Sequence, residues 1–538
     1  METFAELSVQ PAVERRAHPS HQPIPAPFRE PYGPRRMLHG ALLAASRGGL
    51  EDLPRLVKVA TNAAVHARRL GGPLPAGAPN EVLRAAAAAL GARSLPAEGM
   101  GAELALERVA HVLVEYGLDL SHPRAAAHLQ PPTLTVAVAA DTLASVSNAS
   151  LDTYDSGPSA IAVERWLIAA LVELAGFGPR ADGVLTPGGS LSNLLALMLA
   201  RDAAGQSAGV DVHRQGTAGL LAPVVYCSEL AHFSVHRACA ALGLGEDAVR
   251  MVPSNGRRKL CTRQLRTMLE AGRGHTTPLA IVCTAGTTDF GSIDPLHALA
   301  DLAREFDVWL HVDAAYGFGC LFSRKLAPLL DGISRADSVT LDLHKLGFQP
   351  AATSVLLLGD TAGFGSLERE VPYLNPSDDT EAGFDGLLGR SLQTTRRADA
   401  IKAVASMLAL GKRGLGELVD ACHDLAAHAE LRIAESANLR LVAGASLSTV
   451  LFRYHPAGEL SAEVLEELQG TLRRRLLERG IALIGRTVAR LDGDSMPRTC
   501  LKLTLVNPTT TPGDLDDLLR AVVRMGRELE SELRGVEP

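Results

Sequence analysis

The chain is 538 residues long, which is enough for two or three domains and a large buried core. Its composition is ordinary for a soluble globular protein, with 46% apolar and 21% charged residues, and its formal net charge of −7 does not indicate nucleic-acid binding. Seven dispersed cysteines, none in a Cys-x-x-Cys pair, argue against a zinc site or a disulfide framework and favour a reducing cytosol.

Residues 1–120 are predicted to form an N-terminal arm and a helical segment. Residues 1–32 are rich in Pro, Arg and Glu and lack an apolar core, so we expect a flexible arm or a clamp that orders on a partner, and no secretory signal. The runs 80–90 and 102–118 have a helical pattern. No stretch of about 18 uninterrupted apolar residues occurs, so we expect no membrane partner and a cytoplasmic location.

Residues 121–410 alternate short apolar runs with amphipathic segments. This alternation is typical of an α/β domain with a mostly parallel central sheet, and we predict that these residues form the large domain. The expected strands are 223–227, 279–284, 308–313, 338–343 and 354–358, and the expected helices include 191–201 and 295–306.

Residues 411–538 show a different pattern, from which we predict a small C-terminal α+β domain. Thr511 is expected to cap the last helix, with Pro512 at its first position and Asp514 three residues after the cap. The other expected elements are a strand-like segment at 439–454, a helix at 462–479 and a strand at 500–506.

A Gly-Gly-Ser turn precedes the apolar helix expected at 191–201. Gly188 and Gly189 let backbone N–H groups approach an anion, and Ser190 adds a hydroxyl donor at the positive end of the helix. The turn lacks the lysine of a Walker loop and the last glycine of a hydrolase nucleophile elbow. It indicates a phosphate site, although such a turn is also common without any ligand.

A histidine follows the strand expected at 223–227. His232 stands where an imidazole can lie flat on a heteroaromatic ring, but a capping or core histidine fits this position equally well. His232 and His236 also have the spacing of two metal ligands on a helix, without an acidic third ligand.

Asp313 ends an apolar strand and is followed by two alanines. A poorly solvated carboxylate needs a positive partner, and a protonated pyridine nitrogen is one, because the carboxylate keeps it protonated. Ala314 and Ala315 are small enough for a flat ring to pack against the chain. An Asp that caps the next turn is the alternative.

Lys345 lies at the end of another apolar strand, after Asp342 and His344. Burial disfavours the ammonium form, which suits a lysine that must lose its proton to attack an aldehyde. A structural lysine that extends to solvent is the alternative.

The four features supply a phosphate cradle, a ring stack, a pyridinium partner and an aldehyde-binding lysine, in that order along the chain. Pyridoxal 5'-phosphate, held as a Schiff base on Lys345, accounts for all four. We therefore predict a pyridoxal-phosphate enzyme.

In these motifs the sequence resembles the group II pyridoxal-phosphate-dependent amino-acid decarboxylases, over roughly residues 122–507. The resemblance implies the aspartate-aminotransferase-like (type I PLP) α/β fold, a homodimer with active sites at the subunit interface, and conversion of an L-amino acid to an amine and carbon dioxide. It also implies a cofactor-binding set, which comprises Gly189 and Ser190 at the phosphate, His232 on the ring, Thr287 near the ring hydroxyl, Asp313 at the pyridine nitrogen, Ala315 on the other ring face, Asp342, His344 and Lys345.

The segment Val371–Pro376 resembles the family's mobile active-site loop, whose tyrosine protonates the carbanion after carbon dioxide leaves. The resemblance thus implies a catalytic role for Tyr373, besides Lys345, His232 and Asp313, and a tyrosine here favours plain decarboxylation over oxidative deamination. A surface tyrosine in an Asp-rich loop is the alternative.

The segments 348–350, 392–400 and 501–508 are most similar to the diaminobutyrate and lysine decarboxylase branch, which implies a diamino or basic amino acid as substrate. Lys502 stands where relatives often have an arginine that meets the substrate carboxylate, and a lysine there is a point charge rather than a fork.

Two other classes of function remain open from the sequence. An aminotransferase or a carbon–carbon lyase could use the same pyridoxal-phosphate features, and a catalytically idle homologue could act as a binding partner. A metal-dependent enzyme is the least favoured, because no ligand cluster accompanies the histidines.

Overall fold

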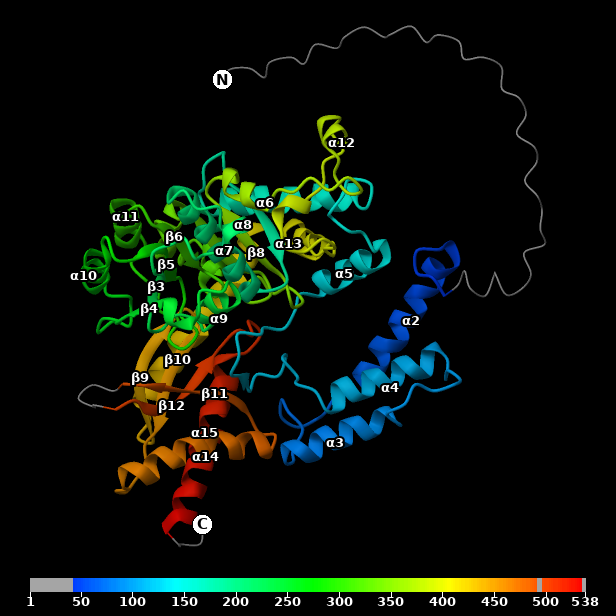
Figure 1. The fold of residues 1–538 in the computed structure, drawn as a ribbon. Coiled ribbons are helices and arrows are strands. Elements are labelled where there is room, and N and C mark those ends of the chain that lie inside the picture. Colours follow the sequence, from blue (N-terminus) through cyan, green and yellow to red (C-terminus); the bar gives the residue numbers. More distant parts are fainter. Residues whose placement is uncertain (1–41, 491–495, 535–538) are drawn as a thin grey trace, which may run out of the picture. The chain divides into compact units, whose positions relative to one another are not determined.

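The computed structural model describes residues 42–490 and 496–534 of the chain (Figure 1). The chain divides into a short unit that ends at Pro54 and a large unit that begins at Arg55. Helix α2 (Arg47–His66) begins in the short unit, and all the elements discussed below belong to the large one. No helix in the described ranges combines the length and the apolar character needed to cross a bilayer.

Two helices follow α2 and agree with the predicted helical segment. They are α3 (Pro79–Leu90) and α4 (Ala102–Glu115). Neither contributes much to a core, because α3 has no buried residue and α4 buries only Ala110. Apolar side chains on both, such as Leu83 and Leu113, are 68% exposed.

The large sheet has seven strands in the order β2-β8-β7-β6-β5-β3-β4 (Figure 1). The four pairings among β3 to β7 are parallel, and β8 runs antiparallel to both β7 and β2. This confirms the prediction of a mostly parallel central sheet. The strands are β2 (Asp182–Thr186), β3 (Pro223–Ser228), β4 (Val249–Val252), β5 (Thr277–Thr284), β6 (Trp309–Asp313), β7 (Ser338–Asp342) and β8 (Ser354–Leu358).

Helices cover both faces of this sheet, which explains why its strands are nearly continuous apolar runs. Alternate residues of β5 divide between the two layers, because successive side chains of a strand point to opposite faces. Ile281 and Cys283 join one core cluster and Ala280 and Val282 another. The first layer contains α6 (Pro158–Leu174), α10 (Thr262–Gly272), α11 (Leu296–Phe306) and part of α13 (Ala400–Glu435), and the second contains α7 (Gly189–Ser207) and α9 (Ser234–Ala241).

The small sheet has five strands in the order β1-β11-β12-β10-β9. The single strand-like segment expected at 439–454 is wrong, because the chain turns back at Leu447, whose φ is 53°, and forms a hairpin. Helices α14 (Ala462–Glu478) and α15 (Pro512–Arg534) pack on this sheet through one apolar cluster. The strands are β1 (Ala125–Ala126), β9 (Leu439–Ser446), β10 (Thr449–Tyr454), β11 (Leu483–Ala489) and β12 (Arg498–Thr504).

The predicted cap of the last helix is confirmed. The Thr511 hydroxyl accepts a hydrogen bond from the Asp514 backbone N–H at 3.2 Å, and the Asp514 carboxylate accepts one from the Thr511 N–H at 3.0 Å. The remaining helices are α5 (Thr135–Ser147), α8 (Val212–Gln215) and α12 (Ser377–Glu381).

The predicted domain boundaries at residues 120 and 410 stay predictions. Helix α13 crosses the second boundary but is broken at Gly411, whose φ of 63° and ψ of 178° are not helical. Strand β1 comes from the part of the chain assigned to the large domain, yet it pairs in parallel with β11 of the small sheet.

Candidate active site

Polar side chains collect where three neighbouring parallel strands of the large sheet end. Thr284 ends β5, Asp313 ends β6 and Asp342 ends β7. Parallel strands end at the same edge of a sheet, and ligands of open α/β sheets bind in the crevice there. A cavity of about 300 Å³ lies at this edge. Eight of the predicted site residues line it: Gly189, Ser190, His232, Asp313, Ala315, Asp342, His344 and Lys345.

The Lys345 amine is held by a carboxylate in the same turn. Its Nζ lies 2.9 Å from Oδ2 of Asp342, whose side chain is buried and also accepts a hydrogen bond from the Ser354 hydroxyl at 2.5 Å. His344 Nδ1–H donates to the Thr353 carbonyl at 2.9 Å, which leaves the other ring nitrogen facing Asp342 at 3.8 Å. The Lys345 side chain itself remains 21% exposed to the cavity.

Helix α7 begins at the cavity with Gly189, where any larger residue would displace a neighbouring group. A Cβ on Gly189 would lie 2.6 Å from Oδ1 of Asp342, closer than any real contact. The preceding Gly188 has a φ of 133°, which disfavours any other residue. The first N–H groups of a 19-residue helix and the Ser190 hydroxyl therefore face the cavity at close range.

Asp313 is 6% exposed, and its carboxylate is held by two hydrogen bonds. Oδ1 accepts from the Ala315 backbone N–H at 3.1 Å, and Oδ2 accepts from the Asn193 amide at 2.8 Å. Within the described ranges no lysine, arginine or histidine forms an ion pair with this carboxylate. A buried carboxylate of this kind has capacity left for one more donor, and a cationic one suits it best.

His232 reaches the cavity from the turn before α9. Its Nδ1 lies 2.8 Å from the Ser234 hydroxyl, which fixes the orientation of the ring. Burial lowers the pKa of His232, and the opposing effect of the Asp313 charge is smaller. The imidazole is thus neutral near pH 7, as a ring that stacks on another ring should be.

The donors and acceptors around the cavity fit pyridoxal 5'-phosphate. The α7 N-terminus with Gly189 and Ser190 suits the phosphate, Asp313 suits the protonated ring nitrogen, and Lys345 suits the aldehyde. Ala315, beside Asp313 in the lining, leaves room for a flat ring.

Two predicted residues lie just outside the lining. Thr287 is 1% exposed, and its hydroxyl lies 2.8 Å from that of Ser292, while the neighbouring Thr288 lines the cavity instead. Lys502 is buried behind the same wall, where its Nζ donates to the Thr288 carbonyl at 3.1 Å and to Oδ1 of Asp289 at 3.0 Å.

Tyr373 does not reach this cavity within one chain. Its side chain is 83% exposed, on the loop between β8 and α12. Other residues of that loop, such as Glu368 and Asn375, border a separate cavity of about 530 Å³. The structure of a single chain therefore does not bring Tyr373 to Lys345.

Sequence reasoning assigned no role to Asn193 or Tyr316, which also line the cavity. The Tyr316 hydroxyl lies within 2.9 Å of the hydroxyls of Ser448 and Thr449 in the β9–β10 hairpin, and burial raises the pKa of Tyr316 to about 12. Asn193 binds Asp313 directly. The sequence signal for Asn193 was the polar residue at every second position of its partner strands β6 and β7, which are otherwise apolar.

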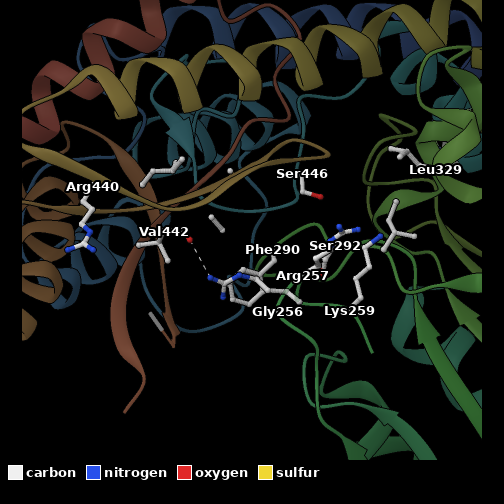
Figure 2. Close-up of a pocket in the computed structure, with 14 residues that line it drawn as sticks. Gly256, Arg257, Lys259, Phe290, Ser292, Leu329, Arg440, Val442 and Ser446 are labelled. Carbon is white, nitrogen blue, oxygen red and sulfur yellow. Dashed lines mark hydrogen bonds between the residues drawn. The ribbon is translucent and has the colours of Figure 1, made fainter. Parts of the chain in front are cut away.

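A larger cavity of about 480 Å³ contains none of the predicted residues (Figure 2). Figure 2 shows Arg257 and Lys259 on one side and Arg440 on the other. Arg258 crosses it, stacked 4.2 Å from the Phe290 ring centre and bonded to the Val442 carbonyl at 3.3 Å. Nowhere in the described residues do three His, Cys, Asp or Glu side chains gather as metal ligands, at either cavity.

Comparisons with known proteins agree with the predicted family. Residues 94–455 match the pyridoxal-dependent decarboxylase conserved domain. The chain is 42% identical to an L-2,4-diaminobutyrate decarboxylase of Rhizobium meliloti over 81% of this chain and 84% of that protein, and 33% identical to one of Acinetobacter baumannii over 81% and 86%. A crystal structure of the glutamate decarboxylase domain of diaminobutyrate-pyruvate transaminase and L-2,4-diaminobutyrate decarboxylase from Vibrio parahaemolyticus matches with a TM-score of 0.81 and 30% identity, over 92% of this chain and all of that one.

These matches confirm the aspartate-aminotransferase-like fold and the resemblance to the diaminobutyrate branch. The chain belongs to the pyridoxal-phosphate-dependent amino-acid decarboxylases, which are carboxy-lyases with pyridoxal 5'-phosphate as cofactor.

Proposed function

We propose that this protein decarboxylates an L-diamino acid, with L-2,4-diaminobutyrate as the first candidate, and that it acts as a cytoplasmic homodimer. The reaction consumes the amino acid and a proton and releases carbon dioxide and the diamine. Two relatives that share most of their length with the chain are named L-2,4-diaminobutyrate decarboxylase, which supports this substrate class.

The observation that carries the proposal is the cavity where Lys345, Asp313, His232 and the α7 N-terminus meet. When bound there, pyridoxal phosphate supplies an electron-withdrawing ring that accepts the electron pair left by departing carbon dioxide. Asp313 keeps the ring nitrogen positive, and Lys345 anchors the aldehyde through its amine. Gly189 and Ser190 hold the phosphate, and His232 stacks on the ring.

The pair formed by Lys502 and Asp289 provides charges that match a diamino acid. Lys502 donates to Thr288 and Asp289 from behind the cavity wall, so it contributes a positive charge near the place of a substrate carboxylate. The Asp289 side chain is 44% exposed, and its second carboxylate oxygen can accept from the side-chain ammonium of a diamino acid. Lys502 thus supplies the positive charge for the substrate carboxylate at a position where relatives often have arginine.

Tyr373 is proposed to act on the active site of the partner subunit, where its hydroxyl returns a proton to the former α-carbon. Its exposure within one chain supports this arrangement, since a tyrosine that acts in the partner's site need not pack against its own subunit.

The test is a decarboxylation screen of the purified protein over the standard amino acids, L-2,4-diaminobutyrate and L-ornithine. Carbon dioxide release with diaminobutyrate at the highest kcat/KM supports the proposal. Formation of a keto acid without carbon dioxide would instead assign an aminotransferase, and no turnover by protein that retains its cofactor would assign an idle homologue. Preference for an aromatic or acidic amino acid would leave the reaction standing and reject the substrate class.

A further inference from the structure

A chain of hydrogen bonds runs under α7 along the strands that end in Asp313 and Asp342. Trp309, His311 and Asp313 alternate along β6 and therefore point to the same face of the sheet. On β7, Ser338 and Thr340 stand opposite His311 and Asp313 in the parallel register. Two neighbouring strands, otherwise apolar, thus present one continuous polar strip to α7.

Asn193 of α7 uses all its hydrogen-bonding groups on this strip. The side chain is 2% exposed. Its Nδ2 donates to Asp313 Oδ2 at 2.8 Å and to the Ser234 hydroxyl at 2.9 Å. Its Oδ1 accepts from the Thr340 hydroxyl at 2.8 Å and from His311 Nε2 at 3.0 Å. A flipped amide would place an oxygen against the Asp313 carboxylate, so one orientation is strongly favoured.

The donors in the strip have a single consistent direction. Oδ1 of Asn193 can only accept, so His311 carries its proton on Nε2 and its Nδ1 is an acceptor. That nitrogen lies 2.8 Å from the Ser338 hydroxyl, which itself accepts from Trp309 Nε1–H at 2.8 Å. Burial lowers the pKa of His311 to about 4, so the ring stays neutral and keeps this tautomer at neutral pH.

The other branch leads to the residue proposed to stack on the cofactor ring. The Ser234 hydroxyl accepts from Asn193 at 2.9 Å. His232 Nδ1 accepts from the Ser234 backbone N–H at 3.3 Å, so it is unprotonated and also accepts from the Ser234 hydroxyl, at 2.8 Å. His232 then carries its proton on Nε2, on the side of the ring away from Ser234. The Asn193 amide thus contacts Asp313 directly and reaches His232 through the Ser234 hydroxyl.

We propose that Asn193 is a positioning residue for the cofactor, which orients Asp313 and His232 together, and that His311 fixes the amide of Asn193 in the orientation this requires. The inference rests on the roles proposed above for Asp313 and His232. Neither Asn193 nor His311 takes part in the chemical step; their effect is on how well the two cofactor-contacting groups are placed before the cofactor arrives.

The test compares Asn193→Asp with Ser192→Ala in the full-length protein. Asn193→Asp keeps the shape but loses the donor and places a second negative charge against Asp313, whereas Ser192, in the same helical turn and fully buried, bonds to Thr186 outside the strip. The dissociation constant for pyridoxal phosphate, the absorbance spectrum of the bound cofactor, and the melting temperature without cofactor are measured.

We expect Asn193→Asp to weaken cofactor binding by at least about tenfold, which corresponds to about 1.4 kcal/mol, and to alter the spectrum. Ser192→Ala should change the dissociation constant by less than about twofold. It should nevertheless lower the melting temperature of the cofactor-free protein by about as much as Asn193→Asp does. Wild-type affinity and spectrum in Asn193→Asp would overturn the inference.

His311 variants test the second step and decide the matter even if Asn193→Asp fails to fold. His311→Phe should weaken cofactor binding, and His311→Gln, which retains an N–H for Asn193, should restore most of it. Asn193→Leu, His311→Phe and the double variant form a cycle. The fold-changes in the dissociation constant should not multiply in the double variant, because either substitution alone already breaks the hydrogen bond between His311 and Asn193. Multiplicative effects, or equal losses in His311→Phe and His311→Gln, would indicate separate structural damage and overturn the inference.

Asp313→Asn separates failure of this inference from failure of the proposed function. If that variant binds the cofactor like wild type, the role of Asp313 is wrong and the inference falls with it. If Asp313→Asn binds weakly while both Asn193 and His311 variants bind normally, only the present inference is overturned.

Discussion

The Lys345 amine and the Asp342 carboxylate, 2.9 Å apart, meet because Asp342 ends β7 and Lys345 lies in the turn that follows it. The turn leaves the amine facing the same cavity as Asp313, which ends the neighbouring strand. In the proposed site no group other than the Lys345 amine binds the cofactor aldehyde.

Lys345→Ala is therefore expected to abolish both turnover and the yellow absorbance of the lysine-bound cofactor. Absorbance spectra before and after borohydride, together with a carbon dioxide assay, measure the two effects. Lys325→Ala serves as the control, since that lysine forms a surface ion pair with Asp424. Retained colour and borohydride-reducible cofactor in Lys345→Ala would remove Lys345 from this role.

Tyr373→Phe is expected to keep carbon dioxide release but to shift the product, in the presence of dioxygen, from the amine toward the aldehyde and ammonia. The reason is that phenylalanine cannot return a proton to the α-carbon. The amine-to-aldehyde ratio is measured by chromatography, with Tyr116→Phe as the control. An unchanged ratio would exclude Tyr373 as the proton donor.

At the scale of an element, the first residue of α7, Gly189, packs closely against the Asp342 carboxylate. Gly189→Ala would place a methyl group 2.6 Å from Asp342 Oδ1, so either the helix terminus or Asp342 must move. Such overpacking costs about 1–3 kcal/mol. Because the displaced groups line the cofactor cavity, the loss should appear in the affinity for pyridoxal phosphate.

The matched control is Gly178→Ala, where an added Cβ meets nothing within 4 Å. Cofactor titrations of both variants measure the difference. Equal affinities in the two would show that the α7 terminus does not hold the phosphate.

For the whole molecule, the proposed homodimer predicts that two subunits, each defective in amine formation, complement each other. Mixed dimers of Lys345→Ala and Tyr373→Phe contain one site with both native residues if Tyr373 acts across the interface. The isolated mixed dimer should then show about half of the wild-type amine formation per dimer. Activity is assayed after co-expression with two different tags and isolation of the mixed dimer, and its absence would place Tyr373 in the site of its own chain.

Buried His311 predicts how the stability of the whole molecule depends on pH. The pKa of His311 in the folded protein is about 4 against an ordinary value of 6.5, because burial disfavours the charged ring. Between these values the unfolded chain binds a proton that the folded chain does not, so stability falls as the pH decreases from 6.5 to 4 and is unaffected above 6.5. The slope is at most about 1.4 kcal/mol per pH unit.

Urea unfolding of the cofactor-free protein across this range measures the effect. His311→Gln, which does not titrate, should have a shallower dependence than the wild type. Parallel curves for the two proteins would mean that His311 is protonated equally in both states.

Local sequence was sufficient to predict the strands that carry the site. The runs that became β3, β5, β6, β7 and β8 were recognisable because a strand covered on both faces is mostly apolar, and their ends agree with the structure to within two residues. The short strands β2 and β4 were not predicted, since Asp182 and Gly183 in one and Arg250 in the other interrupt the apolar pattern.

The sequence by itself determined which side chains the cavity presents, because each of the four motifs is contained in one turn whose residues are adjacent in the chain. The meeting of those motifs depended on strand order, which local patterns do not encode: β2, which leads to Gly189, is separated from β7 only by the antiparallel strand β8.

Only the tertiary structure revealed the contacts from which a role for Asn193 is proposed. Its partners His311, Asp313, Thr340 and Ser234 lie 118, 120, 147 and 41 residues away, and hydrogen bonds over such separations exist only once the sheet and α7 have packed. The role proposed for Tyr373 depends on a second subunit, so one chain supplies no partner that would reveal it.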